Sequence, residues 1–166
     1  MKKPFAKLST IGTVLSLALI SACGQGQGPA GGAAVDPESP EGQAFLFRQA
    51  VMRVAAKKSA TIGGMARGEI PVDEAAFAKA VNDLVVVAGM MTEGFMPQGA
   101  PGDSRALPEI WTNWADFEQK AADLVTGVQG VADATRTGGF AAASPLVQGM
   151  AGNCGGCHRT YRMRTE

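Results

Sequence analysis

The stretch Cys154-Gly155-Gly156-Cys157-His158 lies close to the C-terminus of this 166-residue chain and decides its architecture. The pattern C-x-x-C-H is an attachment motif for c-type haem. On a helix, residues three and four positions apart share a face, so both thiols and the imidazole point the same way. The thiols can then bond to one porphyrin edge while the imidazole reaches the iron. The sequence predicts one covalent haem (heme c) attached through Cys154 and Cys157, with His158 as the axial iron ligand.

Two other kinds of site contain a Cys-x-x-Cys pair. Structural zinc binds four nitrogen or sulfur ligands, but His158 is the only histidine of the chain and the third cysteine, Cys23, lies near the N-terminus. A thioredoxin-like redox pair is expected beside a βαβ pattern, which is absent from this sequence. A non-haem metal- or thiol-binding module is therefore the alternative of a different class, and the haem site is favoured over it.

The N-terminus predicts export. Three lysines within the first seven residues precede an apolar run at 8–20, which is too short to cross a bilayer as a permanent helix. The run ends in ISAC at 20–23, which resembles the lipobox of bacterial lipoproteins, whose cysteine is acylated. We predict a lipoprotein-type signal peptide at 1–22 and a membrane anchor through acylated Cys23 on the periplasmic face. An ordinary secretory signal with an incidental cysteine is the alternative, and it also implies export.

The segment 23–40 is dominated by Gly, Gln, Pro and Ala, has almost nothing to bury, and is predicted to be a flexible tether. The remaining residues, 41–166, have the length of one domain. Removal of the three N-terminal lysines leaves 12 basic residues against 15 acidic ones. No basic cluster survives in the mature sequence, so no nucleic-acid partner is indicated.

Beyond residue 40 the apolar residues recur at spacings of three and four, which is the helical period, without the sustained alternation typical of strands. Helices are predicted at about 41–65, at about 73–92 with Asp73 as N-cap, from 108 to a break at Gly138 and Gly139, and at about 140–164. A long Gly/Pro-rich loop is predicted between the second and third helices. This pattern predicts an all-α protein, an antiparallel four-helix bundle with the covalent haem on its C-terminal helix.

With its haem motif on the last helix, the chain resembles the cytochrome c' family of class II c-type cytochromes. The resemblance covers about 41–164 and rests on several blocks in the same order. They are FRQAVM at 47–52, ARGE at 66–69 with Pro71, PEIW at 108–111 with Phe117, and CGGCHRTYR at 154–162. The resemblance implies a haem protein that passes single electrons or binds a diatomic gas such as NO or CO.

The resemblance also implies roles for three further residues. Arg48 matches the first-helix arginine that pairs with a haem propionate. Arg162 matches the arginine one turn beyond the axial histidine, and its i,i+4 spacing from His158 is expected to put a positive charge beside the imidazole and weaken electron donation to iron. Met52 matches the residue that faces the distal side of the haem. In cytochromes c' proper that residue blocks the sixth position without bonding, and in low-spin relatives a methionine there is the sixth ligand.

The predicted function is therefore single-electron transfer, reversible gas binding at five-coordinate iron, or both. Arg48 favours the five-coordinate case, and a low-spin electron carrier with Met52 as sixth ligand is the alternative. No general base, nucleophile or second titratable cluster accompanies the haem motif, so no enzymatic turnover is predicted. The expected partners are redox proteins of the periplasmic face, near which a membrane anchor would concentrate the protein. The family also implies a possible homodimer through the first two helices.

Overall fold

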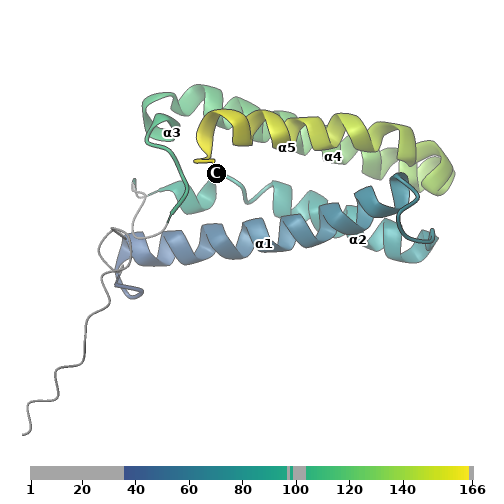
Figure 1. Ribbon diagram of the computed structural model, residues 1–166, viewed down its shortest axis with the longest axis horizontal. Coiled ribbons are helices and arrows are strands. Elements are labelled where there is room, and N and C mark those ends of the chain that lie inside the picture. The colour runs from purple at the N-terminus through teal and green to yellow at the C-terminus, as the bar shows by residue number, and fades with distance from the viewer. Residues whose placement is uncertain (1–35, 97, 99–103, 165–166) are drawn as a thin grey trace, which may run out of the picture. The chain divides into compact units, whose positions relative to one another are not determined.

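The computed structural model describes residues 36–96, 98 and 104–164. These residues form an all-helical bundle (Figure 1), and within them the one β-type pairing is an isolated bridge between Ala106 and Arg162. The predicted signal peptide at 1–22 and the predicted acylation site Cys23 lie outside the described residues. The predicted tether does too, except for its last few residues.

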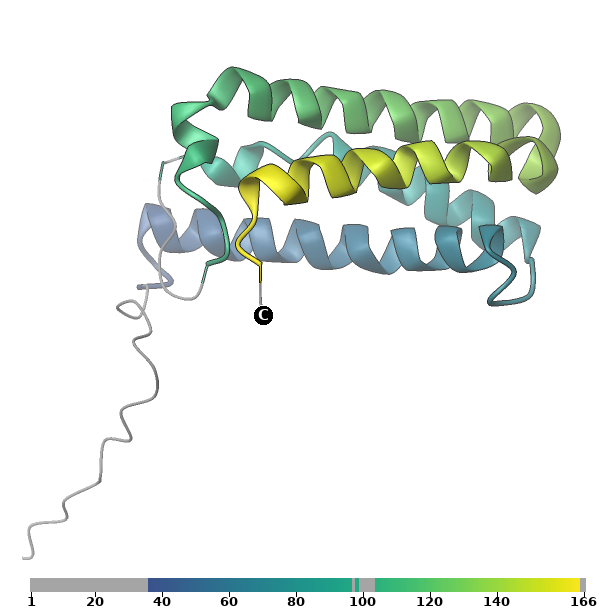
Figure 2. The same cartoon turned by 45° about the horizontal axis from the view of Figure 1, so that its top comes forward.

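The described helices follow one another in the order that the periodicity predicts. They are α1 (Pro40–Ala66), α2 (Glu74–Ala88), the 3-10 turn η1 (Glu93–Phe95), the short α3 (Glu109–Thr112), α4 (Trp114–Ala143), the 3-10 turn η2 (Ser144–Leu146) and α5 (Val147–Tyr161). The long helices α1, α2, α4 and α5 lie side by side, and each runs opposite to the one before it (Figure 2). The predicted antiparallel four-helix bundle is confirmed.

Side-chain caps explain where the first two helices begin. The Ser39 hydroxyl accepts a hydrogen bond from the Gly42 N–H at 3.0 Å, and Pro40 occupies the first turn, where no backbone N–H is needed. Helix α1 therefore begins one residue earlier than predicted, and Pro40 belongs to the bundle rather than to the tether. The Asp73 carboxylate accepts from the Ala76 N–H at 2.9 Å, which confirms Asp73 as the N-cap of α2.

Helix α2 is a core helix. The stretch Glu74–Phe95 is long and apolar enough by composition to cross a membrane, but the side chains of Phe77 and Leu84 are fully buried within the bundle. The helix ends at Ala88, before the predicted boundary at Thr92. Beyond Gly89, the N–H groups of Met90 and Met91 donate to carbonyls three residues back, which tightens the chain into turns.

The third predicted helix is divided in two. Asn113 has φ −120° and ψ 43°, outside the helical region, and separates α3 from α4. The predicted break at Gly138 and Gly139 is confirmed, since both have non-helical angles and Gly139 has φ 63°, a conformation that favours glycine. The Glu74 carboxylate accepts the Phe140 N–H at 2.9 Å, so the donor freed by this break is satisfied from α2.

Helix α5 ends at Tyr161 rather than at the predicted Arg164. The Leu107 N–H donates to the Tyr161 carbonyl at 3.0 Å, and the Met163 N–H donates to the Arg105 carbonyl at 2.8 Å. These bonds hold the segment before α3 against the end of α5. The backbone groups that would have continued the helix are paired across the two segments instead.

Apolar side chains gather in two clusters. The larger is formed by α1, α2, α4 and α5 and contains most of the fully buried side chains, among them Ile62, Phe77, Val81, Val128 and Val131. The smaller consists of Phe95, Ile110, Phe117 and Tyr161, near the end of the bundle that carries α3. Met52 packs against both clusters and therefore marks the region where they meet.

Candidate haem site

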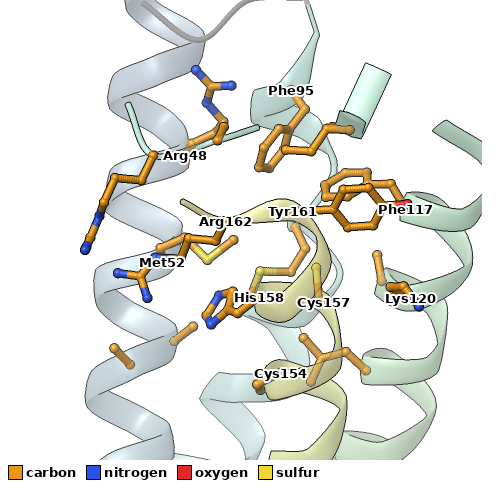
Figure 3. A pocket seen from close by; sticks show the side chains of 18 of the residues that line it. Arg48, Met52, Phe95, Phe117, Lys120, Cys154, Cys157, His158, Tyr161 and Arg162 are labelled. Atoms are coloured by element: carbon orange, nitrogen blue, oxygen red, sulfur yellow. The ribbon is translucent and has the colours of Figure 1, made fainter. Parts of the chain in front are cut away.

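A cavity of about 640 Å³ lies between α1, α4 and α5 (Figure 3). Its walls come from three long helices, from Met91 and Phe95 after α2, and from the segment 104–106 with Ile110 of α3, which are far apart in the sequence. Pockets for small molecules and cofactors usually measure about 300 to 1,000 Å³. The cavity is therefore large enough for a cofactor and lies beside the predicted attachment motif.

Helix α5 presents the motif to this cavity. The side chains of Cys154, Cys157 and His158 all line it, as the three-and-four spacing predicts. The helix is anchored by the buried Met150, and the Asn153 side-chain amide donates to the Asp123 carbonyl of α4 at 2.9 Å. Two thiols and an imidazole thus share one face of a helix that is held by a buried side chain and by a hydrogen bond to α4.

The surroundings of these groups set their protonation. Burial raises the pKa of the Cys154 and Cys157 thiols, so both are protonated at neutral pH. Burial, followed by the positive charges of Arg162 and Arg105, lowers the pKa of His158. The imidazole is therefore neutral at neutral pH, which is the form that binds a metal.

The geometry does not favour the zinc alternative. Within residues 36–96, 98 and 104–164, no three His, Cys, Asp or Glu side chains lie close enough together to hold a metal ion. Structural zinc needs four such ligands around one point. In a haem site the two thiols bond to the porphyrin edge and the imidazole binds the iron at its centre. The three groups therefore need not surround a single point, and their arrangement fits a haem.

The wall on α1 carries Met52, the residue expected on the distal side. Its side chain is half-buried and lines the same cavity as His158. In Figure 3 Met52 and Lys120 lie on opposite sides of the view, with Cys157 and His158 between them. Ala55 and Ala56 continue the α1 wall with small apolar side chains. This wall offers a thioether as its one soft potential ligand.

Arg48 lies on the same helix, one turn before Met52, and is only 6% exposed. Its guanidinium carbon lies 4.9 Å from the centre of the Phe95 ring, a cation–π contact, and burial lowers its pKa. Gly94 allows this approach, because a Cβ there would come within 2.5 Å of the Arg48 Cγ. Arg48 lines the cavity, where a cofactor carboxylate could accept charge-assisted hydrogen bonds from it.

Arg162 lines the cavity too, and its positive charge acts on His158 as expected, but its backbone conformation differs from the expectation. It was expected beside His158 through helical spacing, yet it follows the last helical residue and has extended angles, φ −124° and ψ 128°. The bridge to Ala106 fixes its position instead. The same pairing brings Arg105 to the cavity, a residue the sequence analysis missed because nothing in a Gly/Pro-rich loop indicates such a pairing.

A hydrogen-bonded network lies beside Cys157. The Tyr161 hydroxyl donates to the Asp116 carboxylate at 2.5 Å, and the Lys120 ammonium lies 3.6 Å from the other oxygen of that carboxylate. Burial and the neighbouring Asp116 raise the pKa of Tyr161 to about 12. The Tyr161 ring packs edge-on against Phe117, 5.4 Å between centres. Lys120 was not singled out from the sequence, and its position on the cavity wall becomes visible only in the fold.

Comparison with known proteins agrees with this geometry. Residues 43–162 match the family model described as Cytochrome C'. Cytochrome c-554 of Cereibacter sphaeroides is 31% identical over 121 residues, which cover 70% of this chain and 90% of that protein. Cytochrome c' of Halomonas halodenitrificans is 30% identical over 128 residues, covering 72% and 95%. The structure of cytochrome c' from Shewanella frigidimarina is similar with a TM-score of 0.71 and 27% identity, covering 76% and 98%.

The match extends over most of the bundle and includes the whole cavity wall from α1 to α5. Members of this family are periplasmic four-helix bundles with one covalent c-type haem. The residues present fit that group, since a helix face with two thiols and a neutral imidazole borders a cavity of cofactor size. The chain belongs to the cytochrome c' family and is a c-type haem protein.

Proposed function

We propose that this protein transfers single electrons, and reversibly binds a diatomic gas such as NO or CO, at a haem held by Cys154, Cys157 and His158. The observation that carries the proposal is the single cavity that these three side chains share. A c-type haem supplies a one-electron couple of ferric and ferrous iron and, when five-coordinate, an open position for a small gas ligand. The proposed function involves no substrate turnover.

The residues around the cavity have distinct tasks in this proposal. Cys154 and Cys157 would form the thioethers, and neutral His158 would bind the iron. The positive charges of Arg162 and Arg105, which lower the pKa of His158, also disfavour imidazolate character and weaken donation to iron. Arg48 would pair with a haem propionate, since a partly buried carboxylate is stabilised by a charge-assisted partner.

Attachment is tested by mass and spectrum. The protein is expressed together with a cytochrome c maturation system and purified from the periplasm or membrane. We expect its mass to exceed that of the polypeptide and any acyl chains by one haem, and we expect the Soret band to survive acidified acetone. A colourless product with the mass of the polypeptide alone would contradict the proposal.

A second candidate is a low-spin electron carrier with Met52 as sixth ligand. The position of Met52 on the wall of the same cavity as His158 is the observation that supports it. The ferric spectrum at neutral pH separates the candidates. A charge-transfer band with a broad Soret indicates an open position, and a long-wavelength band from sulfur ligation indicates that Met52 is bound.

Replacement of Met52 by Ala makes the distinction quantitative. For the five-coordinate protein that we propose, Met52→Ala changes the ferric spectrum little. If Met52 is a ligand, the same change abolishes the low-spin spectrum. Met91→Ala is the matched control, because Met91 also lines the cavity but lies outside α1.

We further propose that acylated Cys23 anchors the protein on the periplasmic face of a membrane. The support is the sequence at 8–23, in which an apolar run ends in ISAC. Radioactive palmitate should label the wild-type protein and should not label Cys23→Ser. Equal labelling of both proteins would contradict the anchor, and the haem spectrum would be unaffected in either case.

A further inference from the structure

The charged side chains that line the cavity all have the same sign. They are Arg48, Arg53, Arg105, Lys120 and Arg162, which we call the basic rim. No Asp or Glu is among the lining residues that the structure describes. The whole chain has a formal net charge of zero, so this segregation is a property of the site and not of the composition.

The members of the basic rim come from four separate segments: α1, the residues before α3, α4 and the end of α5. No two are adjacent in the sequence, and the bridge between Ala106 and Arg162 brings two of the segments together. Elsewhere in the described bundle, several basic side chains have acidic partners, although Lys57 and Arg159 form no ion pair there. Lys58 and Lys79 contact Asp83, Arg67 contacts Glu69, and Arg136 contacts Asp133.

Charges at the cavity are only partly balanced. Lys120 lies 3.6 Å from Asp116, whereas Arg53 is exposed and its hydrogen-bond partner is the neutral Gln49, at 3.1 Å. Arg105 and Arg162 are exposed, and neither forms an ion pair within residues 36–96, 98 and 104–164. Two haem propionates and Asp116 would balance only part of the five positive charges of the basic rim. A cavity lined by one sign focuses the field at its mouth.

We propose that the basic rim is the docking surface for an acidic redox partner protein, whose carboxylates meet Arg53, Arg105 and Arg162 at the cavity. In the encounter one electron leaves the reduced partner and enters the ferric haem, and no bond is formed or broken. Complementary charge of this kind mainly accelerates association. This inference rests on the proposed function, because it requires the haem in the cavity.

The position of the charges favours a protein over a flat membrane surface. The rim residues differ in depth, from Arg48 at 6% exposure to the exposed Arg53, Arg105 and Arg162. With the haem in the cavity, the accessible charges are those of Arg53, Arg105 and Arg162, which come from three separate segments around its mouth, and the carboxylates of a shaped protein surface can be placed to meet each of them. An anionic membrane is therefore treated as a competing outcome of the test.

The test uses the holoprotein, exported without acylation, and three redox reagents in stopped-flow experiments. Reduced flavodoxin serves as an acidic protein donor, hexacyanoferrate(III) as a small anionic oxidant and trisphenanthrolinecobalt(III) as a cationic one. The rate constants with flavodoxin and hexacyanoferrate should fall about tenfold between low and high salt, and the rate constant with the cobalt complex should rise.

Charge-reversal variants locate the effect. Arg53→Glu and Arg105→Glu should each slow the reaction with flavodoxin about three- to tenfold at low salt. Lys57→Glu is the matched control, because Lys57 is exposed on the same helix, undergoes the same change of charge and does not line the cavity. We expect less than about a twofold effect from it.

Any of the following results would overturn the proposal. A control that is slowed as much as Arg53→Glu would show that only net charge matters. Salt dependence with hexacyanoferrate but not with flavodoxin would assign the rim to small anions. Variants that lose binding to phosphatidylglycerol vesicles at an unchanged flavodoxin rate would assign it to a membrane. The Soret band of every variant is recorded first, so that failure of haem attachment, which concerns the proposed function, is recognised separately.

Discussion

The two ends of the bundle are built from the same four helices and differ in almost every physical property. At the end near the α1–α2 turn, Phe77 is fully buried and packs edge-on against Phe140, 5.0 Å between ring centres. At the end that carries α3, the helices enclose a cavity of about 640 Å³. We call these the closed end and the open end. The comparison teaches that stability and chemistry are separated along the bundle axis.

Charge follows the same division. Several acidic and basic side chains outside the cavity form ion pairs, such as that of Lys58 and Asp83, whereas the basic rim of the open end carries charges of one sign. Paired exposed charges keep a helix surface soluble and contribute little to stability. Segregated charges act over a distance on other molecules. Mutations should therefore affect stability at the closed end and spectrum or reactivity at the open end.

The largest expected effect is at the open end. The double variant Cys154→Ala, Cys157→Ala should contain no haem that resists acidified acetone, because no thiol remains at the cavity to form a thioether. Pyridine haemochrome spectra of the extracted protein measure this. Cys23→Ser removes the remaining cysteine and should keep its covalent haem. Covalent haem in the double variant would contradict our assignment of the site.

At the closed end, Phe77→Ala should lower the free energy of unfolding by about 3 to 5 kcal/mol, because it removes a fully buried ring and leaves a cavity. Guanidinium titration of the holoprotein measures the loss. The haem spectrum of the folded variant should be unchanged. Phe47→Ala is the control, since Phe47 is 38% exposed and should lose less than about 1 kcal/mol. An altered ferric spectrum in Phe77→Ala would refute the separation of the two ends.

Tyr161→Phe should lower the free energy of unfolding by about 1 kcal/mol, because it keeps the ring and removes the hydrogen bond to Asp116. The pKa of Tyr161 is raised from 10.0 to about 12, chiefly by burial. Its contribution to stability is therefore fully present below pH 10 and is lost as the pH rises towards 12. Denaturant titrations across this range should show that the advantage of the wild-type protein over Tyr161→Phe shrinks as the pH rises.

NMR of the single tyrosine checks the cause of this alkaline loss, because Tyr161 is the only tyrosine in the chain. Its ring signals should titrate with the raised pKa. An ordinary pKa for this phenol would disprove the alkaline loss of its contribution to stability, even if Tyr161→Phe proved less stable.

Lys58→Met should have the smallest effect of the four, because ion pairs near the surface contribute little. Hydrogen bonds from Lys58 and then Lys79 lower the pKa of Asp83. The pair's contribution is therefore present above the ordinary carboxylate pKa of 3.8 and disappears as the pH falls through the lowered value. Thermal unfolding at neutral and acidic pH measures it, with the exposed Lys57→Met as control. A loss larger than that of Tyr161→Phe would contradict the ranking.

Much of the fold follows from local sequence. The three-and-four spacing predicted four long helical segments, and Asp73, Gly138 and Gly139 predicted a start and a break that the structure confirms. These signals are local because capping and backbone conformation depend on neighbours a few residues away. The end of α5 at Tyr161 was not predicted, because it depends on hydrogen bonds to residues more than fifty positions earlier. The break at Asn113 was not predicted either.

The same distinction applies to the site. The positions of Cys154, Cys157 and His158 on one face follow from helical spacing, and the structure brings them into one cavity. Arg105 and Lys120 could not be found in this way, because a single arginine in a loop or lysine on a helix is usually solvated. They become part of the site through the bridge at Ala106 and the packing of α4 on α5.

Local sequence was sufficient to predict the helical architecture, the attachment motif and the common face of its three side chains, because each depends on contacts within one or two helical turns. Tertiary structure alone decided the cavity, the burial that leaves His158 neutral and the gathering of five positive charges around one opening. Each of those properties depends on residues from segments that are far apart in the chain. Burial and electrostatic potential arise only when the helices pack together.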